Sequence, residues 1–170
     1  MDLLLFVRIL RCSMNIKLIV VSKTDDKYLQ EGIDIYLKRL KHYVNFEMVV
    51  VPALKDVKNS SPEEIKEREA VLLLKQLEKC DAVVLLDEHG KEHTSVGFSR
   101  YLQKHMNSGM RTLAFVVGGA FGFSPKVYDR ATDKLSISQM TFSHQMIRLL
   151  FVEQLYRAFT ILNHEPYHNE

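Results

Sequence analysis

The sequence predicts a single α/β domain built on a largely parallel sheet with helices on both faces. Its 170 residues fit one domain of ordinary size and can bury a core without a disulfide or a structural metal. Short β-branched runs alternate with segments in which apolar residues recur every three or four positions, and this alternation is typical of βαβ units. Both observations favour a parallel sheet. The expected strands are 15–22, 46–51, 82–86, 112–117 and 134–138.

The helices are expected between these strands. Between Asp26 and Val44, apolar side chains recur at helical spacing, which indicates an amphipathic helix. Ser61 can cap the next helix, Pro62 suits its first position, and Glu64 completes a capping box. The expected helices are 26–44, 61–80, 94–107, 125–131 and 142–162, with a turn at 87–91.

Composition and charge exclude several classes of protein. Apolar residues make up 46% and charged residues 26%, as in ordinary globular proteins, which excludes a disordered chain and a fibrous repeat. The 23 basic and 21 acidic residues leave a net charge of +2, too small for bulk charge to bind nucleic acid or an anionic membrane. Lys38, Arg39 and Lys41 form a local basic cluster that fits a solvated helix face, and a patch that contacts phosphates is the functional alternative.

The two cysteines argue against a disulfide framework or a zinc module. Cys12 and Cys80 lie far apart in the chain, and neither belongs to a CxxC pair. We therefore expect a cytoplasmic protein that holds no metal. No apolar run approaches the ~18 residues that span a bilayer.

The first residues of the chain do not fit an export signal. Asp2 introduces an acid at the start, and Arg8 and Arg11 interrupt the apolar stretch. Residues 1–13 are therefore expected to be an extension that is not part of the fold, and the domain is expected to cover 14–170.

Three expected strand ends carry sequences suited to a ligand. Ligands of open parallel sheets bind where the carboxyl ends of the strands meet. One strand ends in Leu85-Leu86-Asp87, another in the glycine-rich run 118–122, and the last in the polar loop 138–143. Glycines allow a ligand to approach the backbone closely. The run matches neither GxGxxG nor a P-loop, so a tight strand-to-helix turn is the alternative.

Several candidate functional groups lie near the end of the chain. His144 and Arg148 lie one turn apart at the start of the last expected helix, where a lowered pKa would keep the His144 ring neutral. Capping or packing is the alternative for His144. Glu153 and Arg157 are expected to form a structural i,i+4 pair. The tail 163–170 holds a tyrosine and two histidines, which could stack on a base or move a proton but lack a third metal ligand.

Four segments in this order resemble the SPOUT-superfamily RNA methyltransferases, and among them the bacterial family that methylates N3 of a pseudouridine in 23S ribosomal RNA. The resemblance covers residues 14–170. Four ordered motifs over one domain are specific, whereas the glycine run alone would not be. The motifs are LLDEHGK (85–91), FVVGGAFG (115–122), LSISQMTFSH (135–144), and EQLYRA (153–158) with PYH (166–168).

The resemblance implies a fold, an assembly and a cofactor. The fold would be the SPOUT methyltransferase fold, a parallel sheet whose C-terminal part threads a trefoil knot, which is a rare exception to the rule against knots. The protein would be a homodimer in which the tail of one subunit approaches the cofactor of the other. The cofactor would be S-adenosyl-L-methionine, held by Leu86, Gly118, Gly119, Ser138, Gln139, Met140, Thr141, Phe142 and Ser143.

The resemblance also implies roles for individual residues. The substrate would be 23S rRNA in the assembled ribosome. The methyl group of the cofactor is already activated by the sulfonium charge, so no metal is expected. The protein would align the methyl group with N3 and remove the N3 proton. His168 is the first candidate for positioning or proton transfer and His144 the second, while Tyr167 is suited to stack on an extruded base. The expected RNA contacts come from Lys38, Arg39, Lys41 and Arg148.

Two positions depart from the family pattern. Asn169 stands where a basic residue is common after the Tyr-His pair, and Ser143 stands where Pro is usual before the histidine. The motifs leave two alternatives open. One is another SPOUT methyltransferase that acts on tRNA or on a different rRNA base, and the other is a non-catalytic, ribosome-associated protein that binds the cofactor.

Overall fold

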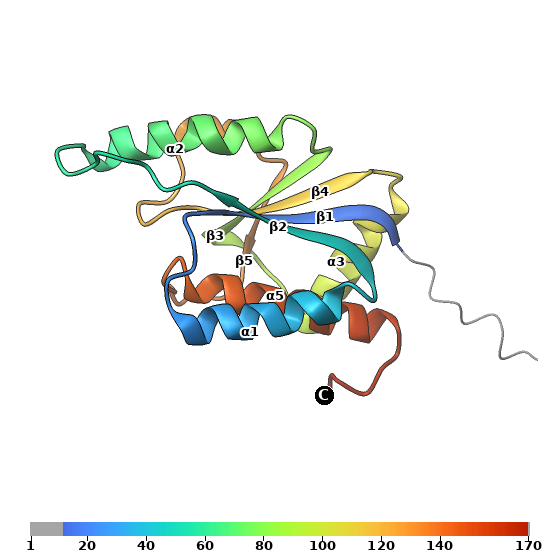
Figure 1. Ribbon diagram of the computed structural model, residues 1–170. Helices are drawn as coiled ribbons and strands as arrows, with labels where there is room; N and C mark the ends of the chain where they lie inside the picture. The colour runs from blue at the N-terminus through green and yellow to red at the C-terminus, as the bar shows by residue number, and fades with distance from the viewer. Residues whose placement is uncertain (1–11, 170) are drawn as a thin grey trace, which may run out of the picture.

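The computed structural model describes residues 12–169, which form one five-stranded sheet with helices on both faces (Figure 1). The strands lie in the order β2–β1–β4–β3–β5, and every pair of neighbours is parallel. The predicted parallel α/β fold class is confirmed. The strands are β1 (Cys12–Val21), β2 (Val44–Val51), β3 (Ala82–Glu92), β4 (Thr112–Val117) and β5 (Asp133–Ser136).

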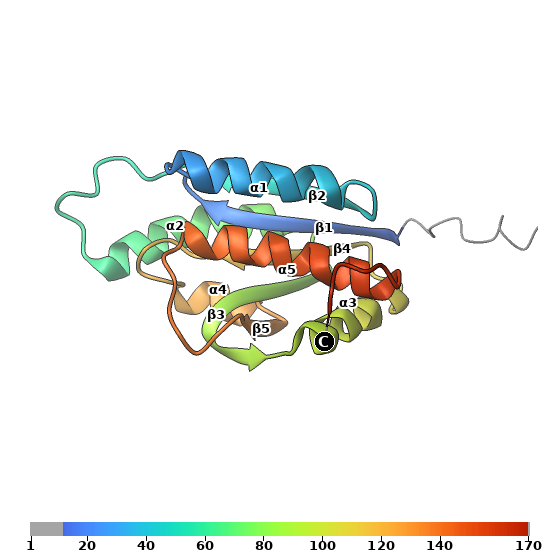
Figure 2. The same ribbon diagram turned by 90° about the horizontal axis from the view of Figure 1, so that it is seen from below.

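Two layers of helices cover the sheet. On one face α5 packs between α1 and α3, and on the other face α2 packs beside α4 (Figures 1 and 2). In the larger core, Leu18 and Phe115 of the sheet pack with Phe151 of α5, and in the smaller core Ile19 packs with Leu73 of α2. The helices are α1 (Lys27–Leu40), α2 (Pro62–Leu77), α3 (Ser95–Asn107), α4 (Pro125–Arg130) and α5 (Met146–Leu162).

The start of α2 follows the predicted capping signals. Ser61 Oγ accepts a hydrogen bond from the Glu64 N–H (3.2 Å), and Glu64 Oε2 accepts one from the Ser61 N–H (3.0 Å). The predicted capping box is therefore confirmed. By contrast, α1 ends at Leu40, earlier than predicted, because the chain turns immediately afterwards and enters β2 at Val44.

β3 differs from the prediction in a way that shapes the site. The predicted strand ended at Leu86 and gave way to a turn, whereas β3 continues beyond this residue. Leu86 and Lys91 both pair with Leu135 of β5, so residues 87–90 bulge out of the ladder. Gly90 permits the return to β5, because a Cβ at this position would lie 2.6 Å from the Leu135 nitrogen. The bulge brings polar side chains to the carboxyl end of the sheet.

Other element boundaries also differ from the prediction, among them the end of β5, which is Ser136 and not 138. α5 begins at Met146 rather than at 142, because Ser143 Oγ accepts a hydrogen bond from the Met146 N–H (3.1 Å) and closes a turn ahead of the helix. β1 begins at Cys12, before the predicted start at 15. Residues 1–11 of the expected extension lie outside the described residues.

Residues 12–169 lack two features, a membrane-spanning helix and a cluster of metal ligands. No helix in this range is long and apolar enough to cross a membrane. Within the same range, no three His, Cys, Asp or Glu side chains gather in a group that could hold a metal ion. The Cys80 thiol is free and buried.

Candidate functional site

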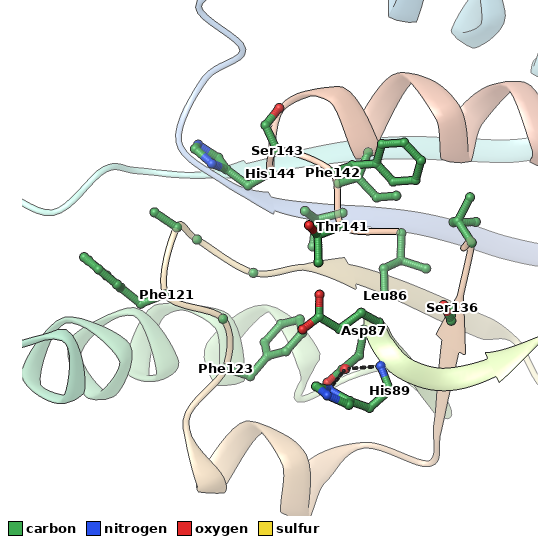
Figure 3. A pocket seen from close by; sticks show the side chains of 18 of the residues that line it. Leu86, Asp87, His89, Phe121, Phe123, Ser136, Thr141, Phe142, Ser143 and His144 are labelled. Carbon is green, nitrogen blue, oxygen red and sulfur yellow. Dashed lines mark hydrogen bonds and ion pairs between the residues drawn. The ribbon is translucent and has the colours of Figure 1, made fainter. Parts of the chain in front are cut away.

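A cavity of about 690 Å³ opens at the edge of the sheet where β3, β4 and β5 end (Figure 3). Cavities of this size hold small-molecule ligands. The structure thus brings together the three strand ends that the sequence singled out. Gln139, predicted to bind the cofactor, is exposed and does not line the cavity. The other predicted cofactor residues, Leu86, Gly118, Gly119, Ser138, Met140, Thr141, Phe142 and Ser143, line it together with Asp87, His89, Phe121, Tyr128 and His144.

The glycine-rich run forms a tight turn that requires glycine. Gly122 has a φ of +80°, and its N–H donates to the Gly119 carbonyl (3.2 Å). A Cβ on Gly119 would lie 2.5 Å from Oε2 of Glu69, which projects from α2. The Glu69 side chain is buried, and Oε2 has no hydrogen-bond partner in the described part of the chain. Burial raises the pKa of the Glu69 carboxyl.

The polar loop 138–143 forms another wall of the cavity. Ser136 Oγ donates to the Ser138 carbonyl (2.8 Å), and Ser138 Oγ accepts from the Met140 N–H (3.0 Å), so the loop is held by its own side chains. Met140 is 76% exposed and Phe142 is 42% exposed. Apolar side chains left in water beside a cavity are typical of binding surfaces.

Asp87 is a buried acid at the carboxyl end of the sheet. Its side chain is only 7% exposed although it lines the cavity. Oδ1 accepts a hydrogen bond from the His89 N–H (2.8 Å), drawn in Figure 3, and Oδ2 accepts one from the Tyr128 hydroxyl (2.5 Å). Burial acts to raise the pKa of Asp87, but the hydrogen bonds from Tyr128 and His89 outweigh it and hold the pKa below its usual value.

His144 lines the cavity from the turn that precedes α5. The lowered pKa predicted for this residue is confirmed. Its main cause is burial, followed by the positive charge of Arg148, while Asp25 acts in the opposite direction. α5 begins at Met146, so His144 lies just ahead of the helix N-terminus. The lowered pKa favours a neutral ring at pH 7.

The predicted contact between Arg148 and RNA is wrong for this fold. The Arg148 side chain is completely buried. Its guanidinium donates to the carbonyls of Val21 (2.6 Å) and Ser22 (3.0 Å) at the end of β1 and to Thr24 Oγ1 (3.1 Å). Its Nε donates to the His144 carbonyl (2.9 Å). Arg148 therefore fastens the turn before α5 to the end of β1.

The C-terminal tail lies at the far end of α5 from the cavity (Figure 2). The Tyr167 hydroxyl donates to Glu153 Oε1 (3.0 Å), and its ring lies 4.8 Å from the Tyr156 ring and 4.8 Å from the Arg157 guanidinium. Arg157 also forms the predicted pair with Glu153 (2.5 Å) and approaches His168 Nδ1 (3.4 Å). Because α5 is about 25 Å long, Tyr167 and His168 do not line the cavity of their own chain.

The predicted basic patch lies beside this tail. Lys38, Arg39 and Lys41 are exposed at the C-terminal end of α1. The Arg39 guanidinium lies 5.4 Å from the ring centroids of both Tyr36 and Tyr156. The structure thus separates the predicted functional residues into two groups, one around the cavity and one around the tail.

The chain is similar to a known protein family over nearly all of its described residues. The family model for predicted SPOUT methyltransferases matches residues 14–168. The chain belongs to this family. It is 56% identical over 157 residues to a Flavobacterium johnsoniae protein and 57% identical over 157 residues to a Parabacteroides distasonis protein, both named Ribosomal RNA large subunit methyltransferase H. Each alignment covers 92% of this chain and 100% of the relative.

Solved structures support the same fold. A Bordetella pertussis protein described as a probable methyltransferase has a TM-score of 0.56 at 13% identity, covering 87% of this chain and 98% of that one. A methylase family protein from Neisseria gonorrhoeae has a TM-score of 0.53 at 14% identity, covering 94% and 88%. At these identities the likeness concerns the fold alone.

The cavity of this SPOUT methyltransferase suits the S-adenosylmethionine-type methyl donor that the family implies. Its apolar lining can cover an adenine ring, and the turn around Gly119 lets a ligand reach the backbone. Asp87 adds a buried acceptor. Sequence reasoning noted Asp87 only as a strand end and missed its contact with Tyr128, since these residues are brought together by the pairing of β3 with β5 just after α4.

Gly119→Ala is expected to weaken binding of S-adenosylhomocysteine about tenfold or more, because the added Cβ must displace either the buried Glu69 carboxyl or the turn that lines the cavity. Isothermal titration calorimetry would measure the dissociation constant. Glu69→Ala removes the opposing atoms, so the double variant should recover most of the affinity. Equal binding by wild type and Gly119→Ala would contradict the steric argument.

Proposed function

We propose that this SPOUT methyltransferase transfers a methyl group from S-adenosylmethionine to N3 of a pseudouridine, position 1915, in 23S rRNA of the assembled ribosome. The observation that carries the proposal is the identity of 56% and 57% to relatives named Ribosomal RNA large subunit methyltransferase H over their full length. The net charge of +2 fits an enzyme that recognises its substrate by shape and makes few phosphate contacts of its own.

The cofactor would occupy the cavity at the strand ends. Leu86, Gly118 and Gly119 would hold it on one side and the loop 138–143 on the other. When bound, it supplies a methyl group that the sulfonium charge has already activated. The C-terminal part of the chain would thread the trefoil knot that the family resemblance implies.

The residues of the chain then have two tasks, to align N3 with the methyl group and to accept the N3 proton. His144 lines the cavity, and its lowered pKa favours the neutral ring that can accept a proton. His168 from the tail is the other candidate for positioning or proton transfer. Tyr167 would stack on the extruded base.

His168→Ala and His144→Ala are each expected to lower the single-turnover rate of methyl transfer about 100-fold, which is the usual contribution of a general base. Rapid-quench measurements on ribosomes with saturating cofactor would give these rates. His105→Ala, on α3, is a matched control and should keep the wild-type rate. Wild-type rates in both test variants would remove the general-base assignments.

A homodimer would bring the tail to a cavity. Within one chain, α5 keeps Tyr167 and His168 away from the cavity lining. In a dimer with two-fold symmetry, each tail can approach the cavity of the partner, and both sites are then completed in the same way. The contacts of Tyr167 with Glu153 and Arg157 fix the position of the tail on α5, which supports this proposal.

Neutralising the basic patch by changing Lys38, Arg39 and Lys41 to Gln is expected to weaken ribosome binding about tenfold at low salt, since each phosphate contact contributes to counterion release. Filter binding at several salt concentrations would measure the affinity, and the logarithm of the affinity should fall less steeply with the logarithm of the salt concentration than for wild type. A control with Lys58, Lys75 and Lys79 changed to Gln removes the same charge from other exposed positions. Unchanged ribosome affinity in the patch variant, or an equal loss in the control, would count against an RNA contact at this patch.

Methyl transfer from labelled S-adenosylmethionine would test the proposed function directly. The substrates are ribosomes from a strain that lacks this gene, free 23S rRNA, ribosomes with an unmodified uridine at the target position, and bulk tRNA. Nucleoside mass spectrometry should find N3-methylpseudouridine on ribosomes alone. Label in tRNA would assign the protein to a different SPOUT activity, and no label despite cofactor binding would leave a binding factor.

A further inference from the structure

The Asp87 carboxylate can accept further hydrogen bonds from a ligand in the cavity. A carboxylate offers about four lone-pair sites. Oδ1 accepts from the His89 N–H and lies 3.2 Å from Nδ1 of the His89 ring, whereas Oδ2 accepts from the Tyr128 hydroxyl. At least one acceptor site on Oδ2 is therefore left for a ligand.

Tyr128 orients this carboxylate. It projects from α4, and its hydroxyl donates to Oδ2 over 2.5 Å. Burial, followed by the hydrogen bond to Asp87, raises the pKa of Tyr128 to about 12, so the hydroxyl keeps its proton at neutral pH. Because Asp87 titrates below its usual range, the pair consists of an ionised acceptor and a neutral donor. The arrangement fixes the direction of the remaining lone pairs.

The position of Asp87 selects the chemical group that it would meet. It follows Leu86 at the start of the bulge in β3, and it lines the cavity together with the apolar side chains of Val117 and Ile137. If the base of a nucleoside packs on these apolar side chains, the ribose that is bonded to it comes next to Asp87. In other nucleotide-binding parallel sheets, an acid at a strand end accepts hydrogen bonds from ribose hydroxyls. An ionised carboxylate suits this role, since it accepts only.

We propose that Asp87, oriented by Tyr128, accepts hydrogen bonds from the ribose hydroxyls of the cofactor and so selects a ribonucleoside. The inference rests on the proposed function, which supplies the nucleoside cofactor. Asp87 is a binding residue in this proposal, and Tyr128 is a positioning residue that acts through it.

Calorimetric titration with S-adenosylhomocysteine and its 2′-deoxy and 3′-deoxy forms would test the proposal. Asp87→Asn should bind S-adenosylhomocysteine about 10- to 100-fold more weakly than wild type, the effect of losing charge-assisted hydrogen bonds. At least one deoxy form should bind wild type and Asp87→Asn equally. Tyr128→Phe, which keeps the carboxylate and its bond to His89, should show a smaller loss of several-fold for the ribose form and no loss for that deoxy form.

Asp129→Asn is the matched control, since it removes one negative charge from the exposed residue next to Tyr128 and should bind all three compounds as wild type does. A thermal melt of each variant checks folding, and Tyr128→Phe carries the test if Asp87→Asn unfolds. Wild-type affinity in Asp87→Asn would overturn the inference. Equal losses for the ribose form and both deoxy forms would also overturn it, because the ribose would then not be the partner.

Titration with S-adenosylmethionine distinguishes a ribose contact of Asp87 from a contact with the sulfonium charge. If Asp87→Asn weakened binding of S-adenosylmethionine but not of S-adenosylhomocysteine, the carboxylate would face the sulfonium charge and the ribose assignment would be wrong. If wild type bound neither compound, the proposed cofactor itself would be wrong, and the inference would fall with it. In every other outcome that contradicts the inference, wild type still binds S-adenosylhomocysteine. Failure of the ribose assignment can therefore be distinguished from failure of the proposed function.

Discussion

Arg148→Met is expected to lower the free energy of unfolding by about 3–5 kcal/mol, because the buried carbonyl of Val21 and the partly buried carbonyl of Ser22 lose a charged hydrogen-bond donor. Methionine keeps the apolar stem of the side chain and removes only the guanidinium. In a domain of this size each kcal/mol corresponds to about 2–4 °C in melting temperature, so the variant should melt roughly 6–20 °C below wild type.

Two further variants make the measurement specific. Arg148→Lys keeps the charge but cannot reach the end of β1 and the His144 carbonyl together, so we expect an intermediate loss of stability. Arg100→Met alters an exposed arginine on α3 and should change stability by no more than about 0.5 kcal/mol. Denaturant unfolding monitored by circular dichroism would give all four values. A wild-type midpoint for Arg148→Met would show that these hydrogen bonds add nothing to stability.

Mixed dimers of the proposed homodimer should recover activity that neither parent has. Gly119→Val should displace the turn that lines the cavity, because its side chain meets the buried Glu69 carboxyl. The double variant Tyr167→Ala, His168→Ala removes the tail groups, so each homodimer should lose nearly all methyl transfer. Co-refolding equal amounts makes half of the dimers mixed, and each mixed dimer has one site with both an intact cavity and an intact partner tail. About a quarter of wild-type activity should therefore return.

The control mixes the double variant Tyr167→Ala, His168→Ala with a second variant of the tail. No recovery is expected, because no dimer then has an intact tail. Light scattering would confirm that the refolded protein is dimeric. Failure of the mixed sample to recover activity in confirmed dimers would show that cavity and tail do not act across the subunit interface.

Local patterns in the sequence predicted most of the fold. The alternation of β-branched runs and amphipathic segments is enough to predict a parallel sheet with helices on both faces, because each pattern reflects the period of its own backbone. The capping box at Ser61 was also correct, since all of its partners lie within four residues. The strand order β2–β1–β4–β3–β5 did not follow from these patterns, because it depends on contacts between distant segments.

The errors in the site have the same origin. The resemblance places Arg148 among the expected RNA contacts, and nothing nearby in the sequence shows that the end of β1 offers its guanidinium three oxygens. The contact between Asp87 and Tyr128 joins residues that are 41 positions apart. Glu69 approaches Gly119 from a helix on the opposite side of the sheet from α5. Each of these pairings requires the tertiary structure.

The 17 residues of α5 set the angle as well as the distance between the cavity and the tail. Inserting a single residue into the helix would rotate the tail by about 100° and advance it by about 1.5 Å, whereas four residues would nearly restore the angle and add about 6 Å. A single residue inserted between Glu153 and the end of α5 would therefore turn Tyr167 away from the Glu153 carboxylate that its hydroxyl contacts.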